Sequence, residues 1–477
     1  MSGWALVRVA PVQHHGGTSR TARRLRVAVA GMAVAAVALV AVAGTGAGAA
    51  TDQAEKPTAT EVGITASEFH VAIVADVDSA LAPNLFLGDV LGTRAVAKYL
   101  NAHGGLAGRK VVVDFYDSKL NPAETRNAII QACENDAVMS GTSAVFLTSI
   151  DEMRACKDAK GQATGIPDLP AFAPNVSQQC SDQSFPVIVP ALLCETKDQH
   201  PQTYQTNVQR AFFYQDKYGK DLHGVYIFNN ASRAAHDALF TQLGGLREVG
   251  ITSDEDFDEP PNAQQSVYTQ IVQTMKNKGS NYAQCTLPYT CTVQLRKEAV
   301  LQGLTGMKVW DCSVQCYDER FPKAGGADVD GTYVGIPFMP YMNKADQKAV
   351  PMVGQFVKFM GNENLSSGAA YSWAAGIALR DAVEAQVKAG GVNSVTRATI
   401  IEQLRQIHKF DADGMFVPLR RRRLEALHGV QAVLQSAREA HATDILCRQS
   451  PSGRYRLGRK QSCHNGIVHE TGPRSWV

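Results

Sequence analysis

Residues 94–130 constrain the fold more than any other stretch of the chain. They read as a helix rich in Ala, Val and Leu that stops at Asn101, a glycine-rich turn, an apolar run over 111–116, and a second helix that opens after Asp117 and Ser118. The run VVVDFY is β-branched and aromatic, which is typical of a strand covered on both faces. Strands that alternate with helices predict a parallel α/β sheet.

The glycine-rich turn resembles a hallmark of the type I periplasmic binding proteins, the kind that binds branched-chain amino acids. In that family an Asn, a Gly-Gly pair, an apolar residue, a Gly and a basic residue precede a strand that ends in Asp. The matching residues here are Asn101, Gly104, Gly105, Leu106, Gly108, Arg109 and Asp117. The resemblance spans about 68–416 and implies two Rossmann-like lobes with parallel sheets, joined by a hinge.

This resemblance implies a domain division of the mature body. The first lobe would comprise 68–192 and 339–412, and the second lobe 193–338. We expect helices over 208–218, 234–248, 266–278, 350–360, 372–389 and 399–408. We expect the acidic, Pro-containing segment 254–261 to form a loop.

Residues 1–50 have the pattern of an export signal peptide. A cluster of Arg over 20–26 precedes an uncharged apolar run over 27–42 and small residues that fit an A-x-A cleavage site. A retained membrane anchor is the alternative, but the apolar run is shorter than the ~20 residues of a typical spanning helix. The chain has no Cys before Cys133, so we do not expect a lipoprotein. Residues 51–67 would form a linker to an extracytoplasmic body.

Residues 417–477 depart from the resemblance. This segment is rich in Arg, includes four consecutive Arg at 420–423, and loses the apolar alternation of the body. One hypothesis is a reading-frame change that replaces the native end; it predicts an open edge on the second-lobe sheet. The alternative is a basic tail that binds an anionic wall polymer or membrane. The body over 51–416 carries more acidic than basic side chains, which disfavours nucleic acid as a partner.

Eight cysteines of the body fall in neighbouring pairs along the chain. In an exported protein such cysteines favour disulfides over metal ligands. The predicted pairs are Cys133–Cys156, Cys180–Cys194, Cys285–Cys291 and Cys312–Cys316. A zinc site from the last four is the alternative, but their spacing lacks a C-x2-C pair. We therefore predict no metal and no cofactor.

Polar residues follow the predicted strands, and in open α/β sheets ligands bind beyond the carboxyl ends of the strands. The first-lobe candidates are Asp78, Ser79, Thr142, Ser143, Asn175 and Ser177. The second-lobe candidates are Asn229, Tyr289 and Phe338. Helix capping is an alternative role for the Ser, Thr and Asn residues, and packing between the lobes is an alternative role for the aromatic residues.

The resemblance implies a binding protein that holds a small ligand between its lobes and delivers it to an ABC transporter permease. The ammonium of an amino acid would meet an acid near Cys291 in this family, but residues 284–294 contain no Asp or Glu. This departure argues against α-amino-acid specificity, and Asp78 is the acid that could replace the missing one. Another carboxylate or an amide remains a candidate ligand.

No catalytic motif of a hydrolase, metalloprotease or nucleotide-binding enzyme occurs in the sequence, so we do not expect an enzyme. We expect a monomer. An extracellular ligand sensor or accessory receptor domain of the same fold is the alternative function.

Overall fold

The structure is a computed structural model of the whole chain. It describes residues 55–188, 208–229, 243–260, 262–286 and 288–416, and short strands at 419–420, 445–449, 455–456, 461–464 and 467–470. The predicted signal peptide over 1–50 lies outside the described residues. Within the described part of the chain, no helix is long and apolar enough to cross a membrane.

The first sheet is parallel and has four strands in the order β2-β1-β3-β4. Their bounds are β1 Glu68–Ala75, β2 Lys110–Asp117, β3 Val138–Ser140 and β4 Asp168–Leu169. The prediction of a parallel sheet built from these segments is therefore confirmed. The fourth strand is short, and Pro170 follows it directly; this residue has no backbone N–H for a sheet ladder.

Strand β1 is buried on both faces, whereas β2 is not. Val71 of β1 faces one apolar cluster and Ala72 faces another, as the alternation of a strand requires. Strand β2 lies at the sheet edge, and within it only Val111 is fully buried. The expectation that VVVDFY is covered on both faces is wrong, because Asp114 occupies one face of the run and an edge strand tolerates a charge there.

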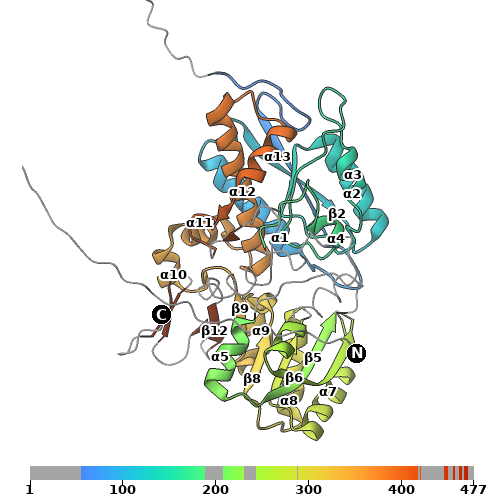
Figure 1. Cartoon of the computed structure of the whole chain (residues 1–477), viewed down its shortest axis with the longest axis vertical. Helices are drawn as coiled ribbons and strands as arrows, with labels where there is room; N and C mark the ends of the chain where they lie inside the picture. Colours follow the sequence, from blue (N-terminus) through green and yellow to red (C-terminus); the bar gives the residue numbers. More distant parts are fainter. Residues whose placement is uncertain are drawn as a thin grey trace, which may run out of the picture. The chain divides into compact units, whose positions relative to one another are not determined.

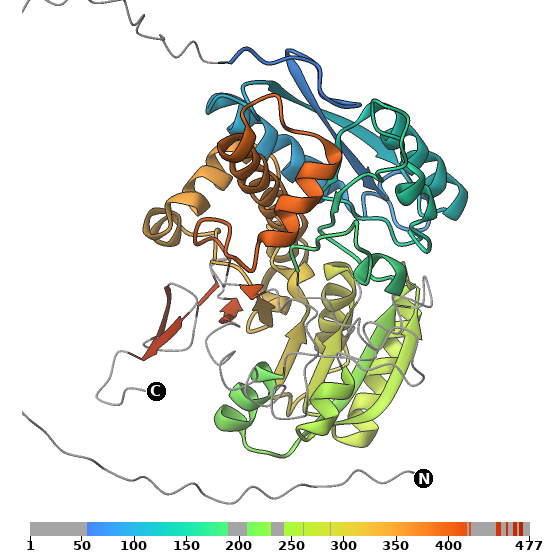
Figure 2. The same ribbon diagram turned by 45° about the horizontal axis from the view of Figure 1, so that its top comes forward.

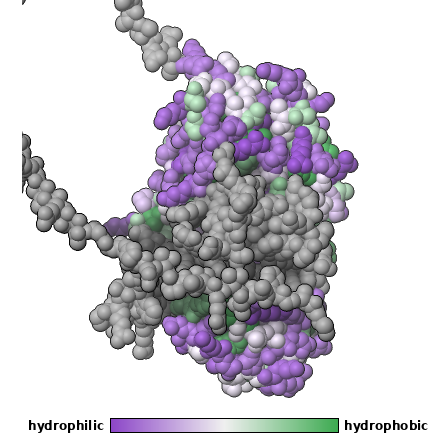
Figure 3. Space-filling view, in the orientation of Figure 1, coloured by the Kyte–Doolittle hydropathy of each residue, from purple (hydrophilic) through white to green (hydrophobic). Residues whose placement is uncertain are grey.

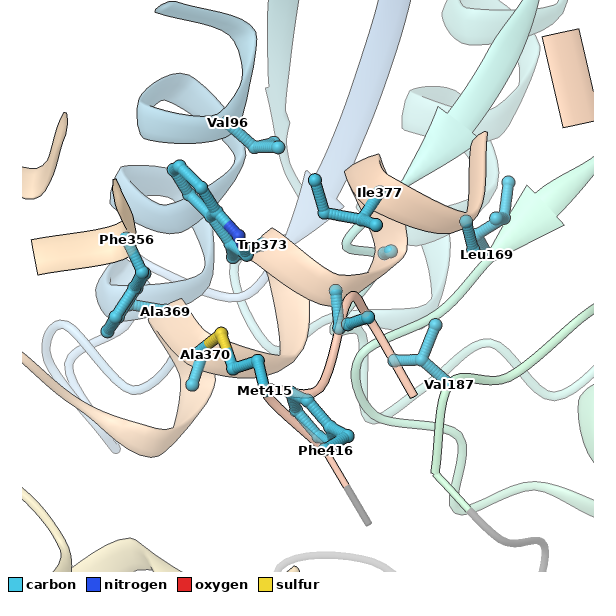
Figure 4. Close-up of a cluster of buried hydrophobic side chains, with 14 of the residues drawn as sticks. Val96, Leu169, Val187, Phe356, Ala369, Ala370, Trp373, Ile377, Met415 and Phe416 are labelled. Atoms are coloured by element: carbon cyan, nitrogen blue, oxygen red, sulfur yellow. The ribbon is translucent and has the colours of Figure 1, made fainter. Parts of the chain in front are cut away.

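The helices that pack on the first sheet come from two separate parts of the chain. Helix α1 (Leu87–Ala102) packs along α12 (Ser367–Gly390), which lies beside it in Figures 1 and 2. Trp373 of α12 is fully buried, close to Val96 of α1 and Phe356 (Figure 4). Helix α2 covers the other face of the sheet. Helix α2 spans Pro122–Asn135. The other helices of this part are α3 Asp151–Ala155, α4 Val176–Gln179, α10 Lys344–Ala349, α11 Pro351–Met360 and α13 Arg397–Gln406.

The second sheet has seven strands in the order β13-β12-β9-β8-β7-β5-β6. Strands β9 to β6 in this order are parallel, and β12 and β13 are antiparallel. The strands are β5 Leu222–Asn229, β6 Ile251–Glu259, β7 Tyr282–Cys285, β8 Val309–Cys312, β9 Tyr333–Ile336, β12 Ile445–Gln449 and β13 Tyr455–Arg456. Helices α7 (Gln265–Lys278) and α8 (Tyr289–Leu301) cover one face, and α5 (Gln209–Tyr218) covers the other.

Two short hairpins and several short helices complete the described elements. The hairpins pair β10 (Lys409–Phe410) with β11 (Leu419–Arg420) and β14 (Gln461–His464) with β15 (Ile467–Glu470). The short helices are η2 Val314–Cys316, α9 Arg320–Gly325 and η3 Gly326–Val329. On the face drawn in Figure 3, hydrophilic side chains dominate the described surface.

Two expectations for the second sheet are wrong. The acidic segment predicted as a loop over 254–261 is mostly the edge strand β6, which pairs only with β5. Glu255, Asp256 and Asp258 are exposed, and Asp254 contacts His223 and Ser280. Ile251 and Phe257 contact the sheet, so charge there marks an edge and not a loop. The reading-frame hypothesis expects an open edge on this sheet because sheet partners are lost, but β9 has a partner in β12, a strand from the segment after residue 417.

The glycine-rich turn between α1 and β2 is held in place by hydrogen bonds from two of its side chains. Asn101 accepts from the backbone N–H of Val111 at 2.7 Å and donates to its carbonyl at 2.9 Å. The buried Arg109 guanidinium donates to the carbonyls of Thr58, Thr65, Ala107 and Val392 and to the side chain of Asn393. The end of the predicted linker is thus packed on the first sheet and its helices.

Candidate functional site

The loops that follow the strands of the first sheet lie side by side. Backbone bridges join Ser143 to Ala75, the last residue of β1, and to Phe172, which follows β4. The loops after β3 and β4 contain four of the candidate residues: Thr142 and Ser143 in the first loop, and Asn175 and Ser177 in the second. The carboxyl ends of the strands therefore form one edge, as expected for a parallel sheet.

Asp76 connects three of these loops through one carboxylate. Its Oδ1 accepts from the Ser118 hydroxyl at 2.6 Å and from the Leu120 N–H at 2.7 Å, and its Oδ2 accepts from the Val145 N–H at 2.8 Å. Burial raises the pKa of Asp76, although these hydrogen bonds counteract the shift. Asp76 was not among the predicted site residues; an Asp directly after the central strand was the available signal.

Asp117, the last residue of β2, sets the conformation of the loop that holds Asp78 and Ser79. Its two oxygens accept from the backbone N–H groups of Val77 at 3.1 Å and Asp78 at 2.8 Å. The Asp78 carboxylate is left exposed at this edge, and Ser79 is half-buried. Asp78 can therefore meet a ligand cation or donor without first breaking a hydrogen bond that shapes the loop.

Thr142 and Ser143 are both fully buried. The Ser143 hydroxyl donates to Asp89 of α1 at 2.7 Å, and burial raises the pKa of Asp89 to about 7. Asp89 therefore holds its proton over much of the range below neutral pH. Gly141, with φ +79°, makes room for this arrangement, because a Cβ there would lie 2.4 Å from the Thr93 hydroxyl oxygen.

A second buried carboxylate lies on β4, the strand that pairs with β3. Asp168 accepts from Gln178 Nε2 at 2.9 Å and from the Ser184 hydroxyl at 3.2 Å. Burial raises its pKa to about 6, while Gln178, Thr142 and Ser184 oppose the shift. Buried Ser140 and Ser372 hydroxyls, which have no hydrogen-bond partner, also lie near this edge of the sheet.

Asn175 and Ser177 tie the last loop to its neighbour. Asn175 Nδ2 donates to the carbonyl of Val145, and the Ser177 hydroxyl donates to the carbonyl of Thr148, each at 2.9 Å. Asn175 stands at the N-cap of α4 but makes no side-chain capping bond. The alternative capping role therefore does not describe it.

The second-sheet candidates do not share one environment. Asn229 is the last residue of β5. Tyr289 is half-buried at the start of α8, where the Arg320 guanidinium lies 5.4 Å from its ring centre and Phe321 contacts its edge. Phe338 is fully buried among Tyr317, Tyr341, Tyr371 and Phe416, so its ring packs within the protein.

Disulfides brace the carboxyl end of the second sheet. Cys285 ends β7 and joins Cys291 of α8, and Cys312 ends the adjacent β8 and joins Cys316. Cys133 and Cys156 are joined beside the first sheet. These three pairs agree with the predicted pairing. In the fourth pair, Cys194 lies outside the described residues.

The described edges offer hydroxyls and backbone N–H groups for ligand recognition, and the first-sheet edge carries the exposed Asp78. The charged groups near Tyr289 are Arg320 and Asp318, which form an ion pair at 2.7 Å. Asp318 is buried and is engaged by Arg320, so it does not replace the acid missing from 284–294. Hydroxyls and backbone N–H groups of this kind are suited to hydrogen bonds with a polar group.

Comparison with known proteins identifies a family. A family model described as "Periplasmic binding protein" matches residues 68–434. A search of curated proteins gives no match.

Three solved structures illustrate the fold similarity. A fatty acid ABC transporter substrate-binding protein from Thermomonospora curvata is 14% identical with a TM-score of 0.57, covering 78% of this chain and 87% of that one. A leucine-binding protein from Thermotoga maritima is 14% identical with a TM-score of 0.53, covering 73% and 90%. A branched-chain amino acid transporter substrate-binding protein from Streptococcus pneumoniae, in complex with isoleucine, is 14% identical with a TM-score of 0.55, covering 82% and 98%.

Proposed function

The chain belongs to the periplasmic binding protein family, and from this premise we propose that it is an extracytoplasmic solute-binding protein. It captures a small molecule between two lobes and delivers it to the permease of an ABC transporter. The proposed lobes are 68–192 with 339–412, and 193–338. The observation that carries the proposal is the edge of the first sheet, where Asp76 and Asp117 hold the loops in one fixed arrangement. Preorganised polar loops reduce the cost of ordering them on binding.

We propose that the ligand is a carboxylate or amide with an apolar portion. The three structures reported above are named for a fatty acid, for leucine and for isoleucine, all of which carry a carboxylate beside an apolar chain. Ser79 and Thr142 supply hydroxyls suited to a carboxylate, whereas the Ser143 hydroxyl and N–H are engaged by Asp89 and by the Val74 carbonyl. The half-buried Tyr289 supplies an apolar wall.

The absence of an acid from 284–294 argues for a ligand without an α-ammonium group. A ligand ammonium would have Asp78 as its exposed partner at the first-sheet edge. Asp78→Asn therefore distinguishes the two cases. It should weaken binding of an amino acid, whose ammonium loses its partner, and leave binding of a simple carboxylate within about twofold. A simple carboxylate forms no ion pair with Asp78 and interacts only weakly with an exposed charge.

The test is a thermal-shift screen of the mature protein against amino acids, amides, short carboxylates and aromatic acids. A ligand that binds only the folded chain raises the melting temperature, and the gain grows with the logarithm of its concentration over Kd. We expect a carboxylate or amide among the hits and a smaller radius of gyration by X-ray scattering with the hit bound, because contacts to both lobes favour a closed form. The proposal fails if no solute changes either quantity.

A matched pair of variants locates the site. Ser79→Ala removes a half-buried hydroxyl at the first-sheet edge and should weaken binding of the hit by roughly tenfold, the effect of one hydrogen bond to a charged group. Ser253→Ala removes a hydroxyl from the edge strand β6, where it contacts Asp256. This control should leave the affinity unchanged. Equal affinities in both variants would place the ligand elsewhere.

A further inference from the structure

A histidine and two aspartates converge on the first sheet, away from the carboxyl ends of its strands. His70 lies near the start of β1, Asp114 lies on β2, and Asp136 precedes β3. One potential ligand atom from each lies within 4.8 Å of the others, and this is the one such group found among the described residues. Strand register explains the meeting, since His70 pairs with Val112 and Ala72 with Asp114, so both side chains share the face covered by α2.

One buried carboxylate oxygen of this cluster has no hydrogen-bond partner. His70 Nδ1 lies 2.7 Å from Asp114 Oδ2. Asp136 is fully buried; its Oδ2 accepts from the Tyr116 hydroxyl at 2.9 Å, and its Oδ1 is buried without a hydrogen-bond partner. An unpartnered carboxylate oxygen in a buried position is costly unless a cation or proton joins it.

We propose that His70, Asp114 and Asp136 form a binding site for a divalent transition-metal ion, of which Zn²⁺ is the representative. One imidazole nitrogen and two carboxylate oxygens are a ligand set that zinc accepts, with a water as the fourth ligand. Two ligand atoms on tetrahedral zinc lie about 3.3 Å apart, since Zn–N and Zn–O bonds are about 2.0–2.2 Å. The His70–Asp114 contact would therefore open by roughly half an ångström.

The surroundings resemble the outer shell of a metal site. His70 Nε2 faces Glu68 Oε2 at 3.5 Å, so a carboxylate orients the ring through its other nitrogen, as metal-bound histidines usually require. Tyr116 orients Asp136. Burial raises the pKa of Asp136 to about 8, with Asp114 adding to the shift. A bound cation would offset both effects.

The positive charge of the nearby Arg397 guanidinium disfavours a metal ion at this site. The Arg397 guanidinium donates to the backbone carbonyls of Cys133 and Asp136 at 2.6 and 2.5 Å. It lowers the pKa of Asp136, although less than burial raises it. Its contacts are to carbonyl groups, so it leaves the carboxylate oxygen Oδ1 available. The ion would join β1, β2 and the turn after α2, and it should stabilise the first sheet independently of the proposed ligand.

The test compares His70→Gln and Asp114→Asn with a matched control, His223→Gln. His223 makes a similar contact to Asp254 at 2.9 Å on the second sheet, but it belongs to no three-residue group. The full chain is stripped with chelator, dialysed against buffered Zn²⁺ and analysed for metal by mass spectrometry. Wild type and the control should retain one zinc per chain more than the two variants. Equal zinc in all four proteins overturns the proposal.

Two further readouts keep the test independent of variant folding. Glu68→Gln should weaken zinc binding by about tenfold, the usual effect of losing an outer-shell partner. In the wild-type chain, Zn²⁺ should protect His70 from modification by diethyl pyrocarbonate, mapped by peptide mass spectrometry, and should leave His223 as reactive as before. Unchanged reactivity of His70 at saturating zinc contradicts the site.

Discussion

At the scale of single residues, Asp76 determines how the loops of the first sheet meet. Three donors from Ser118, Leu120 and Val145 point at its carboxylate. No neutral side chain of the same size accepts from three donors in this geometry, because an amide places a donor of its own among them. The residue therefore acts on the candidate site by positioning its backbone.

Asp76→Asn should destabilise the protein by about 1–3 kcal/mol, the cost of leaving a buried donor unpaired. Urea unfolding followed by circular dichroism measures this as a lower midpoint with an unchanged slope. Asp78→Asn, at an exposed position of the same loop, is the control and should stay within about 0.5 kcal/mol of wild type. Equal midpoints for the two variants would show that the three hydrogen bonds do not matter for stability.

The buried Asp89 makes stability depend on pH. Its pKa in the folded chain is about 7, raised by burial, whereas the unfolded chain releases this proton near about pH 4. Between these values the folded chain holds the proton and the unfolded chain does not, so stability falls as pH rises. The loss is complete above about pH 7.

Asp89→Asn keeps a neutral group in this position and should remove that loss. The free energy of unfolding of wild type should fall relative to the variant between pH 4 and 8, by up to about 4 kcal/mol, since one pKa unit is worth about 1.4 kcal/mol. Urea titrations at several pH values measure the difference. Parallel pH profiles for the two proteins would contradict the buried, protonated state of Asp89.

At the scale of elements, the turn between α1 and β2 depends on one glycine more than on its neighbour. Both Gly104 and Gly105 have positive φ, at +100° and +76°. A Cβ on Gly105 would lie 1.9 Å from the carbonyl oxygen of Arg109, whereas one on Gly104 would meet nothing within 4 Å. The two positions thus separate backbone strain from steric overlap.

Gly104→Ala should cost about 1–2 kcal/mol, the penalty for a side chain in the left-handed region. Gly105→Ala should cost at least about 2 kcal/mol more, because the backbone of the turn must also move. Thermal unfolding of both variants beside wild type measures the difference. Similar melting temperatures for the two variants would mean that the turn relaxes without cost.

Helices with regular apolar spacing could be predicted from the sequence. The edge strand β6 could not, because charged residues interrupt its apolar pattern. The run over 266–278 gave α7 nearly to the residue, and Met275 is fully buried in it. Strand β6 was mistaken for a loop because acids occupy most of its positions and its apolar residues Ile251 and Phe257 lie on opposite sides of a register shift, in clusters on opposite faces of the sheet. Asp89, Asp168 and the cluster at His70 were missed for another reason: their contacts join residues far apart in the chain, which spacing alone does not reveal.

At the scale of the whole molecule, the disulfides should contribute unequally. Cys133–Cys156 closes a separation of 23 residues, and Cys312–Cys316 closes one of 4. In the chain-entropy model the first should stabilise the protein by about 3 kcal/mol and the second by about 2 kcal/mol. Paired Cys→Ser variants, compared by urea unfolding, measure both. A larger loss from the shorter loop would show that strain or packing outweighs loop entropy.

The helical cover of the first sheet cannot be completed early in synthesis, although its four strands lie within 68–169. Helix α1 begins at Leu87, but its partner α12 does not end until Gly390, after strands β5 to β9 have been made. Because synthesis runs from the N-terminus, the ribosome releases α1 long before α12, which covers it, has been made. Translation intermediates that stop short of α12 should be the forms of this protein that chaperones hold and proteases cut.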